Sequence, residues 1–225
     1  LTESAWVEKC LHWKKLFSPI ETQFQSEAEV DLHQLADKLS ENLPTPSTLV
    51  VDSGLNDVIH PTNVRFSDGI RCIHPVSQGA MGFALPAAIG VHYATSHPVV
   101  AVIGDGSIMM NLQELQSVRY HNMPVKIIVI NNNVYSIIRR RQRDLFRKRT
   151  IGTDPNNGVS CPEFASVADC FGLKYVRVNH VGELDSGLAT VFEEEGPVLC
   201  EIMGREDQSY IEVGQTRSVG DRRFV

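Results

Sequence analysis

Two residues twenty-seven positions apart, Asp105 and Asn132, have the types and spacing that point most directly to chemistry. Each follows an apolar run: Val99 to Ile103 leads into Gly104-Asp105-Gly106-Ser107, and Val125 to Ile130 leads into three asparagines. Two such runs joined by a helix-length segment predict a strand–helix–strand unit with parallel strands. The carboxyl ends of parallel strands share one edge of the sheet, where open α/β sheets bind ligands. One carboxylate and one amide oxygen there would suit a magnesium ion that also keeps a phosphate ligand.

Both residues also have a purely structural interpretation. An aspartate before a helix is common as an N-terminal cap, and asparagine clusters favour turns. The occurrence of the two features in one unit favours the metal site over a coincidence of a cap and a turn. The three consecutive asparagines, Asn131 to Asn133, leave open which of them would be the ligand.

Neighbouring residues offer groups that could hold the phosphate. Gly106 and Ser107 open the predicted helix, where backbone N–H groups lack partners and attract anions. The loop Ser53-Gly54-Leu55-Asn56 follows another predicted strand. Two other phosphate motifs are excluded, because Gly104 to Met109 has no third glycine for a dinucleotide fingerprint and the chain contains no P-loop sequence.

The elements that position these residues alternate along the chain. Short apolar runs predict strands, and apolar residues at three- and four-residue spacing predict helices. The predicted strands are 48–51, 70–73, 99–103, 126–130, 175–178 and 198–203. The predicted helices are 26–42, 81–93, 108–121, 136–149, 161–171 and 183–194, with a tryptophan-containing helical pattern in residues 1–20.

This alternation predicts an α/β fold with three layers, in which helices cover both faces of a mostly parallel sheet of about six strands. We expect a linker with N-terminal helices in residues 1–45, the domain with the predicted magnesium–phosphate site in 46–205, and a loosely held tail in 206–225.

Composition narrows the class of protein. The 225 residues suffice for one large domain, and the net charge of −6 gives no general attraction for nucleic acid. Five scattered cysteines favour free thiols in a reducing compartment, and we expect a cytoplasmic protein. The apolar runs are too short for a membrane span and no signal peptide is visible. Because the chain begins with Leu1, we expect it to be part of something longer.

The motifs together resemble a known family. The GDG at residues 104–106, the asparagines some two dozen residues later, and the upstream segment Met81 to Gly90 (MGFALPAAIG) are similar to the thiamine-diphosphate enzymes, in their acetolactate-synthase-like branch. The resemblance covers most of residues 45 to 205 and implies the C-terminal, diphosphate-binding domain with its thiamine-diphosphate-binding fold. Thiamine diphosphate and Mg²⁺ are the cofactors it implies.

The resemblance also implies roles for single residues. Asp105 and the side-chain oxygen of Asn132, the second asparagine, would bind the metal together with the carbonyl of Val134. Met81 would force the cofactor into a bent shape, and Gly79 would offer its carbonyl to the aminopyrimidine. The diphosphate contacts implied by the family pattern, together with those expected above, are Ser53, Gly54, Asn56, Gly104, Gly106 and Ser107. A core methionine is the alternative interpretation of Met81.

The chain departs from the family pattern in two places. The usual Gly-Gln-His is Gly54-Leu55-Asn56 here, and of these Leu55 cannot donate a hydrogen bond from its side chain. The tryptophan-bearing pattern that shapes substrate choice in acetolactate synthases falls near Arg141, within a stretch that holds seven of the 21 basic residues, 139–149. A solvated helix face or an interface is the default interpretation. Our hypothesis is that the arginines of this stretch, and Arg141 in particular, receive an anionic acceptor such as a phosphorylated or nucleotide-linked sugar.

Histidines near the strand ends are weaker candidates. His74 could act on the substrate as a proton donor, as could His60, but isolated histidines are more often structural or exposed.

The resemblance implies an enzyme that decarboxylates a 2-oxo acid, pyruvate above all, and ligates the two-carbon unit to a carbonyl acceptor. The alternatives are a simple decarboxylase and a non-catalytic subunit that is completed by a separate pyrimidine-binding chain.

The pyrimidine-binding domain of the same or another subunit, which supplies a catalytic glutamate in the family, has no counterpart here, so we expect this chain alone to be inactive. The family also implies a homodimer or homotetramer, and an FAD in a middle domain stays open. The lack of clustered cysteines disfavours a ferredoxin-dependent oxidoreductase.

Overall fold

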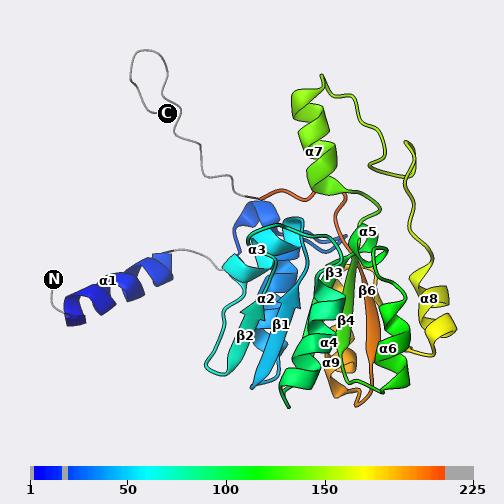
Figure 1. The fold of residues 1–225 in the computed structure, drawn as a ribbon. Helices are drawn as coiled ribbons and strands as arrows, with labels where there is room; N and C mark the ends of the chain where they lie inside the picture. Colours follow the sequence, from blue (N-terminus) through cyan, green and yellow to red (C-terminus); the bar gives the residue numbers. More distant parts are fainter. Residues whose placement is uncertain (1–2, 17–19, 211–225) are drawn as a thin grey trace.

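A six-stranded sheet with helices on both faces forms the body of the molecule (Figure 1). The computed structural model describes residues 3–16 and 20–210. The strands are β1 (Ser47–Val51), β2 (Ile70–Ile73), β3 (Val99–Gly104), β4 (Lys126–Asn131), β5 (Lys174–Val178) and β6 (Val198–Met203). The α-helices are α1 (Glu3–Leu16), α2 (Leu32–Asn42), α3 (Leu55–Asn63), α4 (Ala84–Ala94), α5 (Asp105–Ile108), α6 (Glu114–Tyr120), α7 (Ser136–Leu145), α8 (Phe164–Phe171) and α9 (Leu184–Glu193). Short 3-10 turns are η1 (Thr22–Phe24) and η2 (Val181–Glu183).

The strands are ordered β2-β1-β3-β4-β6-β5, and every pairing in the sheet is parallel. The three-layer α/β prediction is therefore confirmed. All carboxyl ends lie at one edge, where α5 and α7 are drawn in Figure 1. In the central pair Gly104 is opposite Ile130, so that Asp105 and the asparagines leave the sheet side by side.

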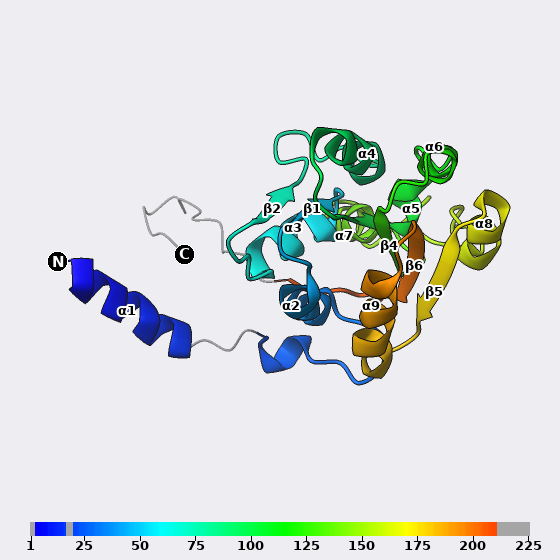
Figure 2. The ribbon, with the colours of Figure 1, turned by 90° about the horizontal axis from the view of Figure 1, so that it is seen from below.

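Two cores hold the layers together, one on each face of the sheet. Alternate residues of β3 belong to opposite cores: Val100 and Val102 pack with α2, α3 and α9, while Ala101 and Ile103 pack with α4, α6 and α8. Figure 2 shows these two groups of helices on opposite sides of the strands. Because β3 and β4 are buried on both faces, they read as continuous apolar runs in the sequence.

Some predicted helices have different bounds in the structure. The helix predicted over 108–121 is divided into α5 and α6, since residues 107–115 are wound in i→i−3 turns such as Met110 N–H to the Ser107 carbonyl. The side-chain nitrogen of Asn111 donates to the Gly82 carbonyl, which holds this segment outside a regular helix. Helix α3 was not predicted, because Pro61 and several polar residues obscure its pattern.

The two ends of the described chain differ in how they are held. None of the residues of α1 is buried, and Figure 1 draws this helix away from the sheet. The tail predicted from residue 206 begins in contact with the body, because the buried Gln208 accepts from the Leu32 N–H at 3.0 Å. Residues 211–225 lie outside the described part.

Candidate functional site

A cavity of about 390 Å³ opens at the carboxyl ends of β1, β3 and β4. Eleven residues predicted from the sequence to contact the cofactor all line it, although they come from four separate segments. They are Ser53, Gly54, Asn56, Gly79, Met81, Gly104, Asp105, Gly106, Ser107, Asn132 and Val134. Their convergence makes this cavity the candidate site.

The Asp105 carboxylate lies buried in the cavity wall between two loops. One oxygen accepts from the Gly106 N–H at 2.7 Å, and the other accepts from the N–H groups of Asn132 at 3.1 Å and Asn133 at 2.7 Å. Burial raises the pKa of the Asp105 carboxyl above its usual value, against the lowering effect of these three hydrogen bonds. An ionised carboxylate held where burial disfavours its charge is a position that a cation would stabilise.

The asparagines divide into one that faces the cavity and one that supports the sheet. The amide nitrogen of Asn131 donates to the buried Glu201 at 2.6 Å, and Asn131 does not line the cavity. Asn132 lines it, with its amide nitrogen bound to the Ser136 hydroxyl at 3.0 Å and its oxygen accepting from the Val134 N–H at 3.2 Å. This geometry favours Asn132 over Asn131 as the ligand.

The oxygens available near Asp105 fit magnesium. The amide oxygen of Asn132 and the carbonyl of Val134, which accepts from Ser136 N–H at 3.0 Å, each keep a second lone pair. With Asp105 they form an all-oxygen set that needs further oxygens from a phosphate or water, as Mg²⁺ prefers. Among the described residues no cluster of three His, Cys, Asp or Glu side chains could hold a metal by itself.

The groups expected to hold a phosphate are only partly free. The Gly106 N–H donates to Asp105, and the Ser107 hydroxyl donates to Asp52 at 2.6 Å, so these two donors are engaged within the chain. Elsewhere in the cavity lining, the side-chain oxygen of Asn56 is buried without a hydrogen-bond partner among the described residues. An amide with an unsatisfied buried atom is well placed to bind a polar ligand.

Gly79 and Met81 form a further part of the rim. Gly79 has φ +57°, and a side chain added there would meet open space, so the backbone can approach a ligand closely. The Met81 side chain is 41% exposed, which excludes the interpretation of a core methionine within this chain.

Two residues that sequence reasoning did not single out also shape the site. Tyr135 lines the cavity and lies against Gly106, where an added Cβ would be 2.0 Å from the tyrosine ring. Asp52 lies behind the cavity and accepts hydrogen bonds from three segments. An aspartate and a tyrosine beside turn residues give no distinctive signal in one sequence.

The two histidines lie outside the cavity. His74 is paired with Asp57, a cavity residue, at 2.5 Å between Nδ1 and Oδ1, but does not line the cavity itself. His60 is fully buried, with Nδ1 3.2 Å from the Asn56 carbonyl. Burial lowers the pKa of His60 to about 4.

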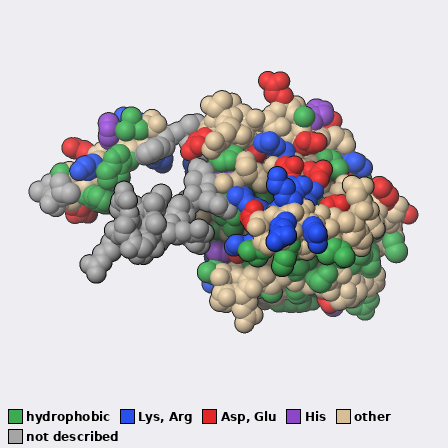
Figure 3. Space-filling view, turned by 90° about the horizontal axis from the view of Figure 1, so that it is seen from above, with side chains coloured by type: hydrophobic (Ala, Val, Ile, Leu, Met, Phe, Trp, Pro, Cys, Tyr) green, Lys and Arg blue, Asp and Glu red, His purple; other side chains and the backbone are tan. Residues whose placement is uncertain are grey.

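A second cavity, of about 280 Å³, adjoins the first and shares Leu55, Ser136 and Ile137 with it. Arg140 and Arg143 line this second cavity, whereas Arg141 is exposed and lines neither. The turn of helix α7 thus directs Arg140 and Arg143 toward the second cavity, whereas the sequence had indicated Arg141, which lies between them in the chain. Figure 3 looks onto this end of the molecule, where Lys and Arg side chains gather beside acidic ones.

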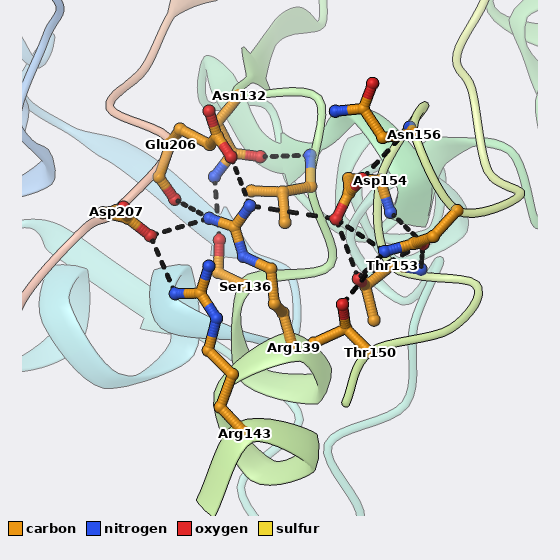
Figure 4. A network of polar contacts seen from close by, with 12 residues as sticks. Asn132, Ser136, Arg139, Arg143, Thr150, Thr153, Asp154, Asn156, Glu206 and Asp207 are labelled. Carbon is orange, nitrogen blue, oxygen red and sulfur yellow. Dashed lines mark hydrogen bonds and ion pairs between the residues drawn. The ribbon is translucent and has the colours of Figure 1, made fainter. Parts of the chain in front are cut away.

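Arg139, which is buried, also lines the second cavity and connects three segments. Its guanidinium binds Glu206 and, at 2.8 Å, Asp207, and it lies 3.9 Å from Asp154 on the other side (Figure 4). These contacts tie α7 to the chain after β6 and to the loop of residues 150–159. Since α7 also carries cavity residues, Arg139 stabilises the wall between the two cavities.

Comparison with known proteins identifies one matching family and several relatives of this chain. Residues 52–202 match the family described as "Thiamine pyrophosphate enzyme, C-terminal TPP binding domain". The acetolactate synthase large subunit of Pyropia yezoensis is 35% identical over 134 residues, which are 58% of this chain and 22% of the relative. Acetolactate synthase isozyme 2 large subunit of Escherichia coli (strain K12) is 29% identical over 75% of this chain and 30% of its own length.

Among solved structures, the thiamine diphosphate-dependent 4-hydroxybenzoylformate decarboxylase of Rhodococcus jostii RHA1 superposes with a TM-score of 0.74 and 26% identity. The superposition covers 86% of this chain and 36% of the decarboxylase. This chain therefore spans between a fifth and just over a third of the length of these relatives. No helix in residues 3–16 or 20–210 is long and apolar enough to cross a membrane.

Proposed function

The chain belongs to the thiamine pyrophosphate enzymes, whose C-terminal TPP-binding domain matches its residues 52–202, and on this premise we propose that its larger cavity binds the cofactor's diphosphate through Mg²⁺. The observation that carries the proposal is the convergence of Asp105, Asn132 and Val134 on one wall of that cavity. The metal would take the Asp105 carboxylate, the Asn132 amide oxygen and the Val134 carbonyl as ligands. Asn56, Ser53 and Gly54, which line the same cavity, would contact the diphosphate.

The rim residues would orient the rest of the cofactor. Met81 is exposed at the rim and would support the cofactor in a bent conformation, while the Gly79 carbonyl would accept from its amino group. When bound, the cofactor supplies a thiazolium ring that accepts the electron pair left by a departing carboxylate. The residues of this chain bind and orient it.

The reaction we propose for the intact protein is decarboxylation of a 2-oxo acid, pyruvate being the first to test, with transfer of the two-carbon unit to a carbonyl acceptor. Both acetolactate synthase relatives support this. The test is product analysis of the full-length protein with pyruvate, with and without an acceptor aldehyde or ketone. A carbon–carbon product, formed with the added acceptor or with a second pyruvate, supports ligation. Acetaldehyde alone under both conditions favours a simple decarboxylase, which the likeness to a solved decarboxylase keeps as the second candidate.

The acceptor we propose is anionic, such as a sugar phosphate or nucleotide-linked sugar. The second cavity adjoins the first and is lined by Arg140 and Arg143, whose guanidinium groups suit phosphate. Arg143→Ala should raise the acceptor's KM roughly tenfold, the effect of losing about 1.4 kcal/mol. Arg141→Ala is the matched control, since this exposed arginine lines neither cavity. Equal KM values for both variants and the wild type would contradict an anionic acceptor at this place.

We further propose that this chain alone has no turnover and needs a pyrimidine-binding domain, from the same or a second subunit. Support comes from the exposure of Met81, which presents an apolar side chain at the open rim. Incubating the isolated chain with pyruvate, TPP and Mg²⁺ tests this directly. Release of carbon dioxide above a protein-free blank would overturn it.

A further inference from the structure

A buried carboxylate behind the cavity connects the loops that carry its working residues. Asp52 directly follows β1, is fully buried, and does not line the cavity. Its own N–H donates to the Val102 carbonyl at 2.9 Å, so its backbone is fixed at the end of the sheet. A carboxylate in such a place needs hydrogen-bond donors, because burial without them costs free energy.

Three separate segments supply those donors. The segment after β1 contributes the Ser53 N–H at 2.8 Å and hydroxyl at 3.3 Å. The segment before α4 contributes the Gly82 N–H at 3.2 Å and the Ala84 N–H at 2.7 Å. Helix α5 contributes the Ser107 hydroxyl at 2.6 Å. Both carboxylate oxygens are used, one for Ala84 and the other for the remaining donors.

Each of these segments presents residues to the cavity. Met81 directly precedes Gly82, Asp105 lies two residues before Ser107, and Ser53 lines the cavity itself. The Gly82 N–H also lies 3.2 Å from the Ser107 hydroxyl, so Asp52, Gly82 and Ser107 form a closed set of contacts. Gly82 has φ +77°, and an added Cβ would be 2.7 Å from the Met110 side chain. The backbone at Gly82 is therefore packed closely against Met110, with no room for a side chain.

We infer that Asp52 is a positioning residue that fixes the Met81 segment and the Asp105 segment relative to each other. Through it, the part of the site that would support the cofactor's rings is held in register with the part that would hold its metal and diphosphate. This inference rests on the proposed function for the identity of the ligand. The coupling of the two segments rests on the hydrogen bonds alone.

The substitution Asp52→Asn tests the inference with little change in volume. An amide has one acceptor oxygen, so its NH₂ group would face either the Ala84 N–H or the donors of Gly82 and Ser107. Losing one hydrogen bond to a charged group in this way should change local equilibria about 10- to 100-fold. The control is Asp37→Asn, the same chemical change in α2 at a residue paired with Arg65 and outside the cavity.

Two measurements on the full-length protein decide the matter. In the cofactor-free Asp52→Asn protein, the amides of Gly82 and Ala84 should exchange with deuterium about 10- to 100-fold faster, while amides of β4 exchange as in the wild type. The Kd for TPP with Mg²⁺ should rise by a similar factor, and Asp37→Asn should change neither quantity. Wild-type exchange at both amides together with a wild-type Kd would overturn the inference.

The two measurements also separate this inference from the proposed function. If the wild-type protein does not bind TPP, the proposed function fails, and the exchange of Gly82 and Ala84 still decides whether Asp52 holds the segment. If Asp52→Asn does not fold, Ser107→Ala removes a single contact of the carboxylate. It should accelerate exchange at Ala84, whose N–H is bound by Asp52 and not by Ser107, and an unchanged rate there would overturn the inference.

Discussion

The Asp105 carboxylate accepts a hydrogen bond from the backbone N–H of Asn132 at 3.1 Å, which joins the ends of two adjacent strands. The same oxygen accepts from Asn133, which has φ +56° and turns the chain sharply. The turn therefore places the backbone of Asn132 beside the Asp105 carboxylate without help from a ligand. A site whose oxygens are arranged by the fold in advance has less conformational entropy to lose on binding.

The two asparagines should respond differently to removal of the side chain. Asn132→Ala should weaken Mg²⁺-dependent TPP binding about tenfold or more, because Asn132 faces the cavity, and should lower the free energy of unfolding less than Asn131→Ala does, because its side-chain hydrogen bonds to Ser136 and Val134 are only partly buried. Asn131→Ala should lower the free energy of unfolding by about 1–3 kcal/mol, because it leaves buried Glu201 without its 2.6 Å donor. Urea unfolding and calorimetric titration of each variant check this. The reverse pattern would make Asn131 the ligand.

Gly106 should tolerate no side chain. An added Cβ would lie 2.0 Å from the Tyr135 ring, so Gly106→Ala must displace Tyr135. Tyr135 directly follows Val134 and the asparagine turn, so the cavity wall would move with it. We expect a loss of about 1–3 kcal/mol in stability and a clear loss of Mg²⁺-dependent binding. Gly90→Ala is the control, since a Cβ there meets nothing within 4 Å and the residue lies in helix α4, where alanine is favoured. Equal melting temperatures for the two variants would contradict the close packing of Tyr135 on Gly106.

His60 should make the fold sensitive to mild acid. Burial lowers its pKa from 6.5 to about 4, so between these values the unfolded chain binds a proton that the native chain excludes. Stability is thus complete above pH 6.5 and falls as the pH drops toward 4, by about 3 kcal/mol in total. In urea unfolding, His60→Gln should lose about 2 kcal/mol less than the wild type between pH 7 and pH 4.5. Parallel losses in both proteins would contradict this role for His60.

The sequence predicted the parts of the site that depend on strand ends. Asp105 and Asn132 each follow a buried apolar strand, and in a parallel sheet that position alone brings them to one edge. Gly79 and Met81 were found through a family motif, and the fold carries both to the same cavity. The three-layer arrangement followed from apolar strands alternating with helices.

The remainder depends on contacts that one sequence does not display. Asp52 reads as an ordinary turn residue, because its partners at Gly82 and Ser107 are brought near only by tertiary structure. Arg141 was chosen because a substrate-shaping pattern of the resembled family falls near it, whereas the direction of each arginine depends on the rotation of α7, which places Arg140 and Arg143 at the second cavity. The divided helix after Asp105 likewise depends on the contact between Asn111 and Gly82.

Calorimetric titration of the full-length protein with TPP tests the central claim most directly. It would be carried out with Mg²⁺ and again with EDTA, beside the variants Asp105→Ala and, as a control outside the cavity, Asp37→Ala. The account predicts Mg²⁺-dependent binding that survives in Asp37→Ala and is lost in Asp105→Ala. Equal affinity with EDTA and with Mg²⁺, or wild-type affinity in Asp105→Ala, would contradict a magnesium-held diphosphate at this cavity.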